Sequence, residues 1–154
     1  MQYLQNQKLE KRGRTEEEGR RRSQTRIRIL LVDDEPDTSM SYQMVLQNAG
    51  YECNSYTDSV KALKEFRPNY YDLCLLDIKM PMLNGFELCK KIREVDKSLY
   101  VIFITAAAEY EKFRSRRYTE ITNNNDNTSF IQKPIGNKEL IQLVNMTIAT
   151  KDAN

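Results

Sequence analysis

The sequence predicts a doubly wound α/β domain in which a five-stranded parallel sheet lies between two layers of helices. From residue 27 onward, short apolar runs with the length of strands alternate with segments of helical periodicity. The runs are nearly continuous in apolar residues, which is typical of strands buried on both faces of a parallel sheet. The length of 154 residues fits one domain, and an apolar content of 40% is sufficient for a core.

Five strands and five helices are predicted in alternation. The strands are apolar runs bounded by polar or turn-forming residues, except for the short polar strand at 51–55, and the helices at 36–49, 86–95 and 138–148 carry apolar residues at helical spacing. In chain order the predicted elements are strand 27–32, helix 36–49, strand 51–55, helix 59–66, strand 72–76, helix 86–95, strand 99–104, a helix from about 107, strand 129–132 and helix 138–148.

Local signals set the helix boundaries. Pro36 suits the first turn of the first helix, and Gly50 stands where a C-terminal cap belongs. Pro68 ends the second helix, and residues 81–85 form a turn-rich loop before the third. The fourth helix is charged and gives way to the Asn-rich residues 122–129, which are typical of a loop.

A basic tail precedes the predicted domain. The first 28 residues hold nine Lys or Arg against four Glu, a net charge of +5, so the remaining 15 basic and 18 acidic residues give −3. Such a polar segment buries too little apolar surface to offset its ordering entropy. We expect a disordered basic tail at residues 1–26, a folded domain at 27–150 and a short C-terminal end at 151–154.

Missing residue types exclude several kinds of chemistry. The chain has no histidine, so it holds no Ser-His-Asp or Cys-His catalytic set, no His-ligated metal and no phosphohistidine relay. Cys53, Cys74 and Cys89 lack CxxC spacing and have apolar neighbours, which predicts reduced core thiols. The chain contains neither a signal peptide nor an apolar run of about 18 residues, so we expect a cytoplasmic protein with no membrane insertion.

Polar residues gather where the predicted strands end. The carboxyl ends of parallel strands line one edge of the sheet, where the ligands of such folds bind. The residues at these ends are, in chain order, Asp33 and Asp34 after the first strand, Asp77 after the third, Thr105 after the fourth and Lys133 after the fifth. We therefore expect three carboxylates, one hydroxyl and one ammonium to converge.

This set of groups predicts a magnesium-dependent phosphoryl site. Converging carboxylates repel unless a cation lies among them or their pKa values rise. Oxygen ligands favour a hard ion, and Mg²⁺ completes its shell with water and phosphate oxygens. Asp77, alone at its strand end, is the candidate nucleophile for an acyl phosphate. Lys133 and the metal would neutralise the phosphoryl oxygens, and Thr105 would donate a hydrogen bond to one of them.

Four sequence blocks resemble the receiver domain of two-component response regulators. The resemblance extends over about residues 27–150 and implies a flavodoxin-like three-layer sandwich that acts in phosphorelay signal transduction. The four blocks are DDEP (33–36), LLDIKMPMLNGFEL (75–88), FITA (103–106) and FIQKP (130–134).

The resemblance also implies how the acidic residues divide their roles. Asp77 would be the phosphoacceptor. Asp34 and Asp77 would bind Mg²⁺ directly, and Asp33 would do so through water. The main-chain carbonyl of Lys79 would supply a further metal ligand.

The switch residues and the partners are implied in the same way. Thr105 and Phe130 would be the switch pair, and Lys133 would contact the phosphoryl group. The phosphoryl donor would be a sensor histidine kinase or phosphotransfer protein, and an output protein would bind the face of the fourth helix, fifth strand and fifth helix. The chain would catalyse its own phosphorylation and dephosphorylation without being an enzyme in the usual sense.

Three functional interpretations follow. Few residues come after the last helix, which favours a single-domain regulator that acts on other proteins. The alternative is a DNA-associated regulator whose tail arginines at 20–22 and 26 contact phosphates, although the glutamates at 16–18 weaken it. A magnesium-dependent phosphatase would generally carry an acid two residues after its nucleophile, where this chain has Lys79.

The segment between Thr105 and Lys133 departs from the family pattern. It contains 27 residues, more than receivers usually place there. The sequence NNNDNTS replaces the usual small Gly-Ala pair before the fifth strand.

Overall fold

The computed structural model describes residues 26–114 and 127–153. The strands are β1 (Arg28–Val32), β2 (Glu52–Tyr56), β3 (Leu73–Leu76), β4 (Tyr100–Thr105) and β5 (Thr128–Gln132). The helices are α2 (Pro36–Asn48), α3 (Ser59–Glu65), α4 (Gly85–Val95), α5 (Ala107–Arg114) and α7 (Asn137–Ala153). Residues 1–25 of the predicted tail and most of the Asn-rich loop lie outside the described residues.

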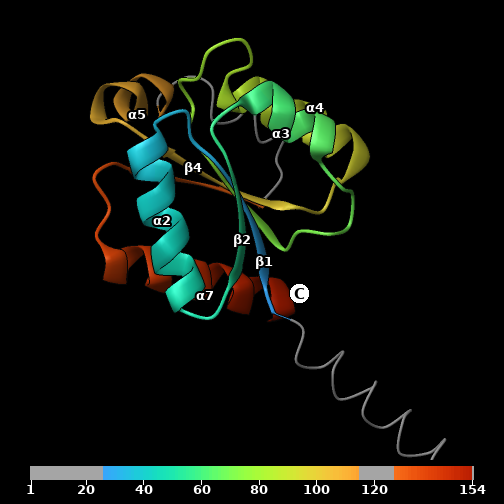
Figure 1. Ribbon diagram of the computed structural model, residues 1–154, viewed down its shortest axis with the longest axis vertical. Coiled ribbons are helices and arrows are strands. Elements are labelled where there is room, and N and C mark those ends of the chain that lie inside the picture. The colour runs from blue at the N-terminus through green and yellow to red at the C-terminus, as the bar shows by residue number, and fades with distance from the viewer. Residues whose placement is uncertain (1–25, 115–126, 154) are drawn as a thin grey trace, which may run out of the picture.

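The strands form one sheet with the order β2-β1-β3-β4-β5. Each neighbouring pair of strands is parallel. Helices α3 and α4 cover one face of the sheet, and α2 and α7 cover the other (Figure 1). The predicted fold class, a doubly wound parallel α/β sandwich, is confirmed.

Each face of the sheet carries its own apolar core. Successive side chains of a strand point to opposite faces. In β1, Leu30 and Val32 therefore pack toward α3 and α4, and Ile29 and Leu31 pack toward α2 and α7. Burial on both faces explains why β1, β3 and β4 read as continuous apolar runs.

Capping hydrogen bonds define the C-terminal end of α2 and the N-terminal end of α4, two helices that border the carboxyl edge of the sheet. Helix α2 starts at Pro36 and ends before Gly50, whose φ of 96° suits glycine. The amide of Gly50 donates to Gln47 and that of Tyr51 to Leu46, which closes the helix. At the start of α4 the Asn84 side chain accepts from the amide of Glu87, and the Glu87 carboxylate accepts from the amide of Asn84.

Arg93 anchors the beginning of β5 from the last turn of α4. Its guanidinium donates to the carbonyl of Asn127 at 2.9 Å and to the hydroxyl of Thr128 at 2.8 Å. The amide of Val101 in β4 also donates to the Asn127 carbonyl. The first residues of β5 are thus held by both α4 and β4.

The last helix is longer than the sequence predicted. It begins at Asn137 and runs to Ala153, whereas the periodic pattern suggested residues 138–148. The Lys151 ammonium lies 3.0 Å from a carboxylate oxygen of Asp72, at the amino end of β3. This contact fixes the last turn to the body of the domain, and no sequence signal marks such a tertiary contact.

The cysteines are buried, as their apolar neighbours in the sequence predicted. Cys53, Cys74 and Cys89 are free and buried. Burial raises the pKa of each thiol, that of Cys53 to about 12. Within the described ranges, no helix has the length and apolar character needed to cross a membrane.

Candidate functional site

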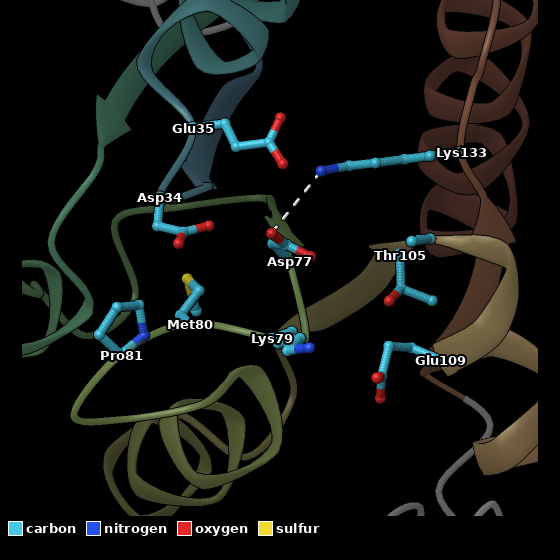
Figure 2. A pocket seen from close by; sticks show the side chains of 10 residues that line it. Asp34, Glu35, Asp77, Lys79, Met80, Pro81, Thr105, Glu109 and Lys133 are labelled. Carbon is cyan, nitrogen blue, oxygen red and sulfur yellow. Dashed lines mark ion pairs between the residues drawn. The ribbon is translucent and has the colours of Figure 1, made fainter.

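The five predicted strand-end residues lie together at the carboxyl edge of the sheet. The amide of Asp77 donates to the carbonyl of Val32 at 2.9 Å, which ties the end of β3 to β1. The amide of Lys133 donates to the carbonyl of Thr105 at 2.7 Å, which ties the end of β5 to β4. These bonds bring Asp34, Asp77, Thr105 and Lys133 to the wall of one cavity of about 500 Å³ (Figure 2).

Asp33, Asp34 and Asp77 form a compact carboxylate cluster. One oxygen from each side chain lies within 4.8 Å of the others. Asp33 sits deepest, and its two oxygens accept from the amide of Glu35 at 3.0 Å and from Lys133 at 2.7 Å. Asp34 and Asp77 line the cavity itself. Asp33 is therefore engaged by protein donors, while the other two carboxylates face the space where a ligand would bind.

Among the described residues, Lys133 is the cation that forms ion pairs with the cluster. Its ammonium lies 2.7 Å from Oδ2 of Asp33 and 3.6 Å from Oδ2 of Asp77. Burial alone would lower the pKa of Lys133, but the hydrogen bond to Asp33 and the charge of Asp77 outweigh burial and raise it. The ammonium therefore keeps its charge at neutral pH.

Asp77 is only 8% exposed, and its carboxyl group is hard to ionise. Its pKa is raised to about 7, chiefly by burial and also by the charges of Asp33 and Asp34, against the opposing charge of Lys133. The single positive charge of Lys133 is thus insufficient to neutralise three neighbouring carboxylates. A hard divalent cation would supply the missing charge, and a donor set made of carboxylate oxygens is the kind that Mg²⁺ prefers.

The buried hydroxyl of Thr105 is a second indication that the cavity binds a ligand. Its side chain is fully buried, and Oγ1 has no hydrogen-bond partner among the described residues. Thr105 also lines the cavity next to the small Ala106. Buried hydroxyls are nearly always paired, because an unpaired one loses its hydration without compensation. An oxygen of a bound phosphoryl group would satisfy this hydroxyl.

Phe130 belongs to an aromatic cluster. On β5 it lies two residues before Gln132, which pairs with Thr105 of β4. It pairs across the sheet with Phe103, and their ring centroids are 5.0 Å apart. Phe86 of α4 lies 5.0 Å from Phe103 and 6.3 Å from Phe130. The cluster connects β5, β4 and α4 directly beside the site.

Gly85 is a site residue that the sequence reasoning did not single out. A Cβ at this position would overlap the backbone oxygen of Asp77 and lie 2.9 Å from Cα of Ile78. The start of α4 thus packs against the peptide of Asp77, which no larger residue permits. The Asn84-Gly85 pair was recognisable as a turn, but its contact with Asp77 depends on tertiary structure.

The cavity has further lining residues that were not predicted. Lys79 was expected through its main-chain carbonyl, and it does line the cavity. The unpredicted residues are Glu35, Met80, Pro81 and Glu109 (Figure 2). Glu35 follows the acidic pair directly, which is a weak signal. Glu109 comes from α5, and its approach depends on the direction of that helix.

Comparison with known proteins identifies the family. Residues 29–145 match the response regulator receiver domain. RprY of Bacteroides fragilis, a transcriptional regulatory protein, is 37% identical over 81 residues, which are 53% of this chain and 34% of RprY. The response regulator ArlR of Staphylococcus aureus is 32% identical over 114 residues, which are 73% of this chain and 48% of ArlR. The chain belongs to the receiver domain family of two-component signalling.

A solved structure supports the same assignment. The response regulator TrrA of Thermotoga maritima, in complex with Mg²⁺-BeF, is 32% identical to this chain with a TM-score of 0.64. The match covers 79% of this chain and 98% of the TrrA chain. By contrast, this chain spans from a third to a half of the length of RprY and ArlR.

Proposed function

We propose that Asp77 accepts a phosphoryl group from a phosphohistidine on a sensor histidine kinase or phosphotransfer protein, in a reaction that requires Mg²⁺. The observation that carries this proposal is the arrangement of groups around the cavity. A buried carboxylate, a charged lysine and a buried hydroxyl that has no partner within the described part of the chain face one space at the carboxyl edge of the sheet. Membership of the receiver family supports the same role.

The transfer is a displacement at phosphorus. A carboxylate oxygen of Asp77 attacks the phosphorus, a P–O bond forms, and the P–N bond to the donor imidazole breaks. The imidazole nitrogen takes a proton from water, and Asp77 becomes an acyl phosphate. Lys133 neutralises charge on the phosphoryl oxygens, and the hydroxyl of Thr105 donates a hydrogen bond to one of them.

The residues that would hold Mg²⁺ are those of the carboxylate cluster. Asp34 and Asp77 would bind it directly, Asp33 would act through water, and the main-chain carbonyl of Lys79 would complete the protein ligands. The engagement of both Asp33 oxygens by protein donors supports its indirect role. The ion supplies positive charge that offsets the repulsion between an anionic donor and the acidic pocket.

Phosphorylation would be transmitted through Thr105 and Phe130. Binding of a phosphoryl oxygen would draw Thr105 toward the cavity, and Phe130 would fill the vacated space. The output partner would then bind the face of α5, β5 and α7. In this role the chain is a cytoplasmic signalling module that catalyses only its own phosphorylation and dephosphorylation.

Intact-mass measurement tests the proposal. The full chain is incubated with acetyl phosphate and Mg²⁺, and we expect the mass to increase by one phosphoryl group. Asp77→Asn should show no gain, whereas the matched control Asp152→Asn, at an exposed position of α7, should behave like the wild type. Labelling of Asp77→Asn, or labelling that EDTA does not reduce, contradicts the proposal.

A further inference from the structure

The edge of the sheet opposite the phosphoryl site carries two arginines packed on one tyrosine. At this amino edge the strands begin. The guanidinium carbons of Arg28 and Arg67 each lie 4.2 Å from the centroid of the Tyr70 ring. The hydroxyl of Tyr70 and Nε of Arg28 both donate to the carboxylate of Glu52, at 3.2 and 3.4 Å. The ring therefore holds two planar cations in place beside the starts of β1 and β2.

A lysine lies beside this cluster. The amide of Asn69 donates to a carboxylate oxygen of Asp96 at 2.9 Å, which joins the loop before β3 to the loop before β4. Lys97 follows Asp96 directly. Arg67 and Lys97 are both exposed, and within the described part of the chain neither forms an ion pair. Their two charges are thus available to a partner.

The two edges of the sheet differ in charge. Five carboxylates line or flank the phosphoryl cavity against two lysines. At the amino edge, Glu52 and Asp72 are each paired with a cation, Arg28 and Lys151. The chain also enters the domain at this edge, after 25 residues that hold seven Lys or Arg against four Glu. A polyanion would therefore be attracted to the amino edge and repelled from the phosphoryl site.

Helix ends explain part of the positive charge. The helices end at the amino edge, where the partial negative charge of a helix terminus favours cations. Lys97 follows α4, and Lys151 lies in the last turn of α7, beside the start of β1 (Figure 1). A helix terminus requires only a charge, however, and does not require two guanidiniums to be held on one ring. The arrangement around Tyr70 is therefore the feature that indicates a specific ligand.

The chemistry of these arginines favours unpaired bases. A guanidinium plane stacks on a base and binds phosphate through paired hydrogen bonds. In a duplex the bases stack on one another, and only their edges are accessible in the grooves. Proteins generally enter a groove with a helix or a two-stranded ribbon, whereas the amino edge consists of loops and strand beginnings. Single-stranded nucleic acid is therefore the polyanion that fits.

An anionic membrane surface fits less well. Membrane-binding surfaces combine basic residues with exposed apolar side chains that enter the bilayer. Within the described ranges, the large apolar residues that are exposed lie on helices or in the loop between β3 and α4, and none of them belongs to a loop of the amino edge. These residues are Met40, Met44, Val60, Met82, Val95 and Met146.

We propose that the amino edge of the sheet binds single-stranded nucleic acid, with Arg67 as the stacking platform and Tyr70 as the residue that positions it. Lys97 contacts phosphate, and the basic residues 1–25 add long-range attraction. The five residues of β1 separate this edge from the phosphoryl site by about 17 Å. A bound strand therefore leaves the site open, and the chain can hold a nucleic acid and a phosphoryl donor at once.

Fluorescence anisotropy of a labelled oligothymidylate of about twelve nucleotides, titrated with the full chain, tests the proposal. At physiological salt we expect saturable binding with a dissociation constant on the order of 10⁻⁵ M. A DNA duplex of the same length should bind more weakly although its charge density is higher, because its bases are not free to stack on Arg67.

Two substitutions at one position separate stacking from charge. Arg67→Lys keeps the charge but loses the guanidinium plane, so it should weaken binding about tenfold and leave the salt dependence unchanged. Arg67→Gln should weaken binding further and reduce the slope of log K against log salt by about 0.7. The matched control Lys61→Gln removes an exposed charge from α3, near the carboxyl edge, and should change binding less than about twofold. Thermal melting confirms that each variant is folded.

An Arg67→Lys variant that binds like the wild type overturns the proposal, because charge alone would then explain binding. So does a duplex that binds more tightly than the single strand, an absence of binding up to about 300 μM, or a loss of all binding when residues 1–24 are removed. Binding to vesicles of anionic lipid but not to the oligonucleotide also overturns it. Asp77→Asn should bind the oligonucleotide like the wild type, so failure of this proposal and failure of the proposed function are distinguishable.

Discussion

Lys133 lies 2.7 Å from Oδ2 of Asp33, closer than the 3.6 Å that separates it from Oδ2 of Asp77. The lysine comes from the end of β5 and the aspartate from the end of β1, so one ion pair joins the two sides of the site. Asp77 shares the same cation at longer range. Among the described residues, Lys133 is the cation that forms ion pairs with this carboxylate cluster, so the charge balance of the cluster depends strongly on it.

Replacement of Lys133 by methionine should destabilise the protein. Lys133→Met leaves the buried Asp33 and Asp77 without their cation, and breaking a buried ion pair typically costs about 3 kcal/mol. Urea unfolding at neutral pH in EDTA measures this loss. The loss should be smaller when Asp77→Asn is also present, because one repelling charge is gone. The exposed Lys138→Met is the control and should change little; an equal loss there would contradict the account.

Asp77→Asn should stabilise the metal-free protein at neutral and higher pH. The folded pKa of about 7 exceeds the ordinary value of 3.8, so between these values the folded protein holds a proton that the unfolded chain has lost. Stability conferred by that proton therefore declines as pH rises through this window. Asparagine removes the penalty, by an amount on the order of 4 kcal/mol at pH 8.

Thermal melting in EDTA across this pH range provides the measurement. The variant and the wild type should melt at similar temperatures at about pH 3, where Asp77 is protonated in the folded protein and mostly protonated in the unfolded chain. Their difference should grow toward pH 8, and Mg²⁺ should raise the melting temperature of the wild type more than that of the variant. A difference independent of pH would show that charge at Asp77 is not the cause.

Most of the architecture could be predicted because buried strands and helix caps have recognisable local sequence patterns. The apolar run before Asp33 and the glycine at position 50 are examples, and both place their elements within one or two residues. The carboxylate cluster was predictable because strand ends meet at one edge of the sheet. Gly85 and Glu109 were not predictable in their roles, since the contact of Gly85 with Asp77 and the position of Glu109 at the cavity arise only when α4 and α5 dock. The extension of α7 to Lys151 depends likewise on the distant Asp72.

Gly85→Ala should destabilise the domain and impair phosphorylation together. The added methyl group would overlap the Asp77 backbone, and overpacking of this kind costs about 1–3 kcal/mol or more. Gly136→Ala is the matched control, because a Cβ there meets only a flexible Glu139 side-chain atom at 3.8 Å. Urea unfolding and acetyl phosphate labelling should separate the two variants. Equal tolerance of both would contradict the close packing of α4 on β3.

Phosphoryl binding should move more than the loops of the site. Adding Mg²⁺ and beryllofluoride should shift amide signals at Thr105, at Phe130 and along the face of α5, β5 and α7. Thr105→Val keeps the side-chain volume but removes the hydroxyl, so it should bind the ligand and lose the distant shifts. Shifts confined to the loops around Asp34 and Asp77 in the wild type would show that the two residues are not a switch.

Removal of residues 1–24 should leave folding and phosphorylation nearly unchanged. The composition of this basic segment predicts long-range attraction to acidic surfaces, which salt screens within about 8 Å at physiological ionic strength. The full and shortened chains are compared by thermal melting, by acetyl phosphate labelling and by salt-dependent binding to duplex DNA. Tight DNA binding that persists at physiological salt and vanishes on truncation would favour the DNA-associated alternative. A large fall in melting temperature would show that the segment packs on the domain.

Because Arg93 anchors the start of β5, the position of Lys133 does not depend on the number of residues that precede β5. Asn127 and Thr128 are held by α4 and β4, and the strand ladder then carries the chain to the site. Closing a longer loop costs only about 0.6 kcal/mol for each doubling of its length. A reporter domain inserted between residues 115 and 126 should therefore leave Lys133 in register with Asp33 and Asp77. This stretch of the chain is the place to build a sensor of the phosphorylated state.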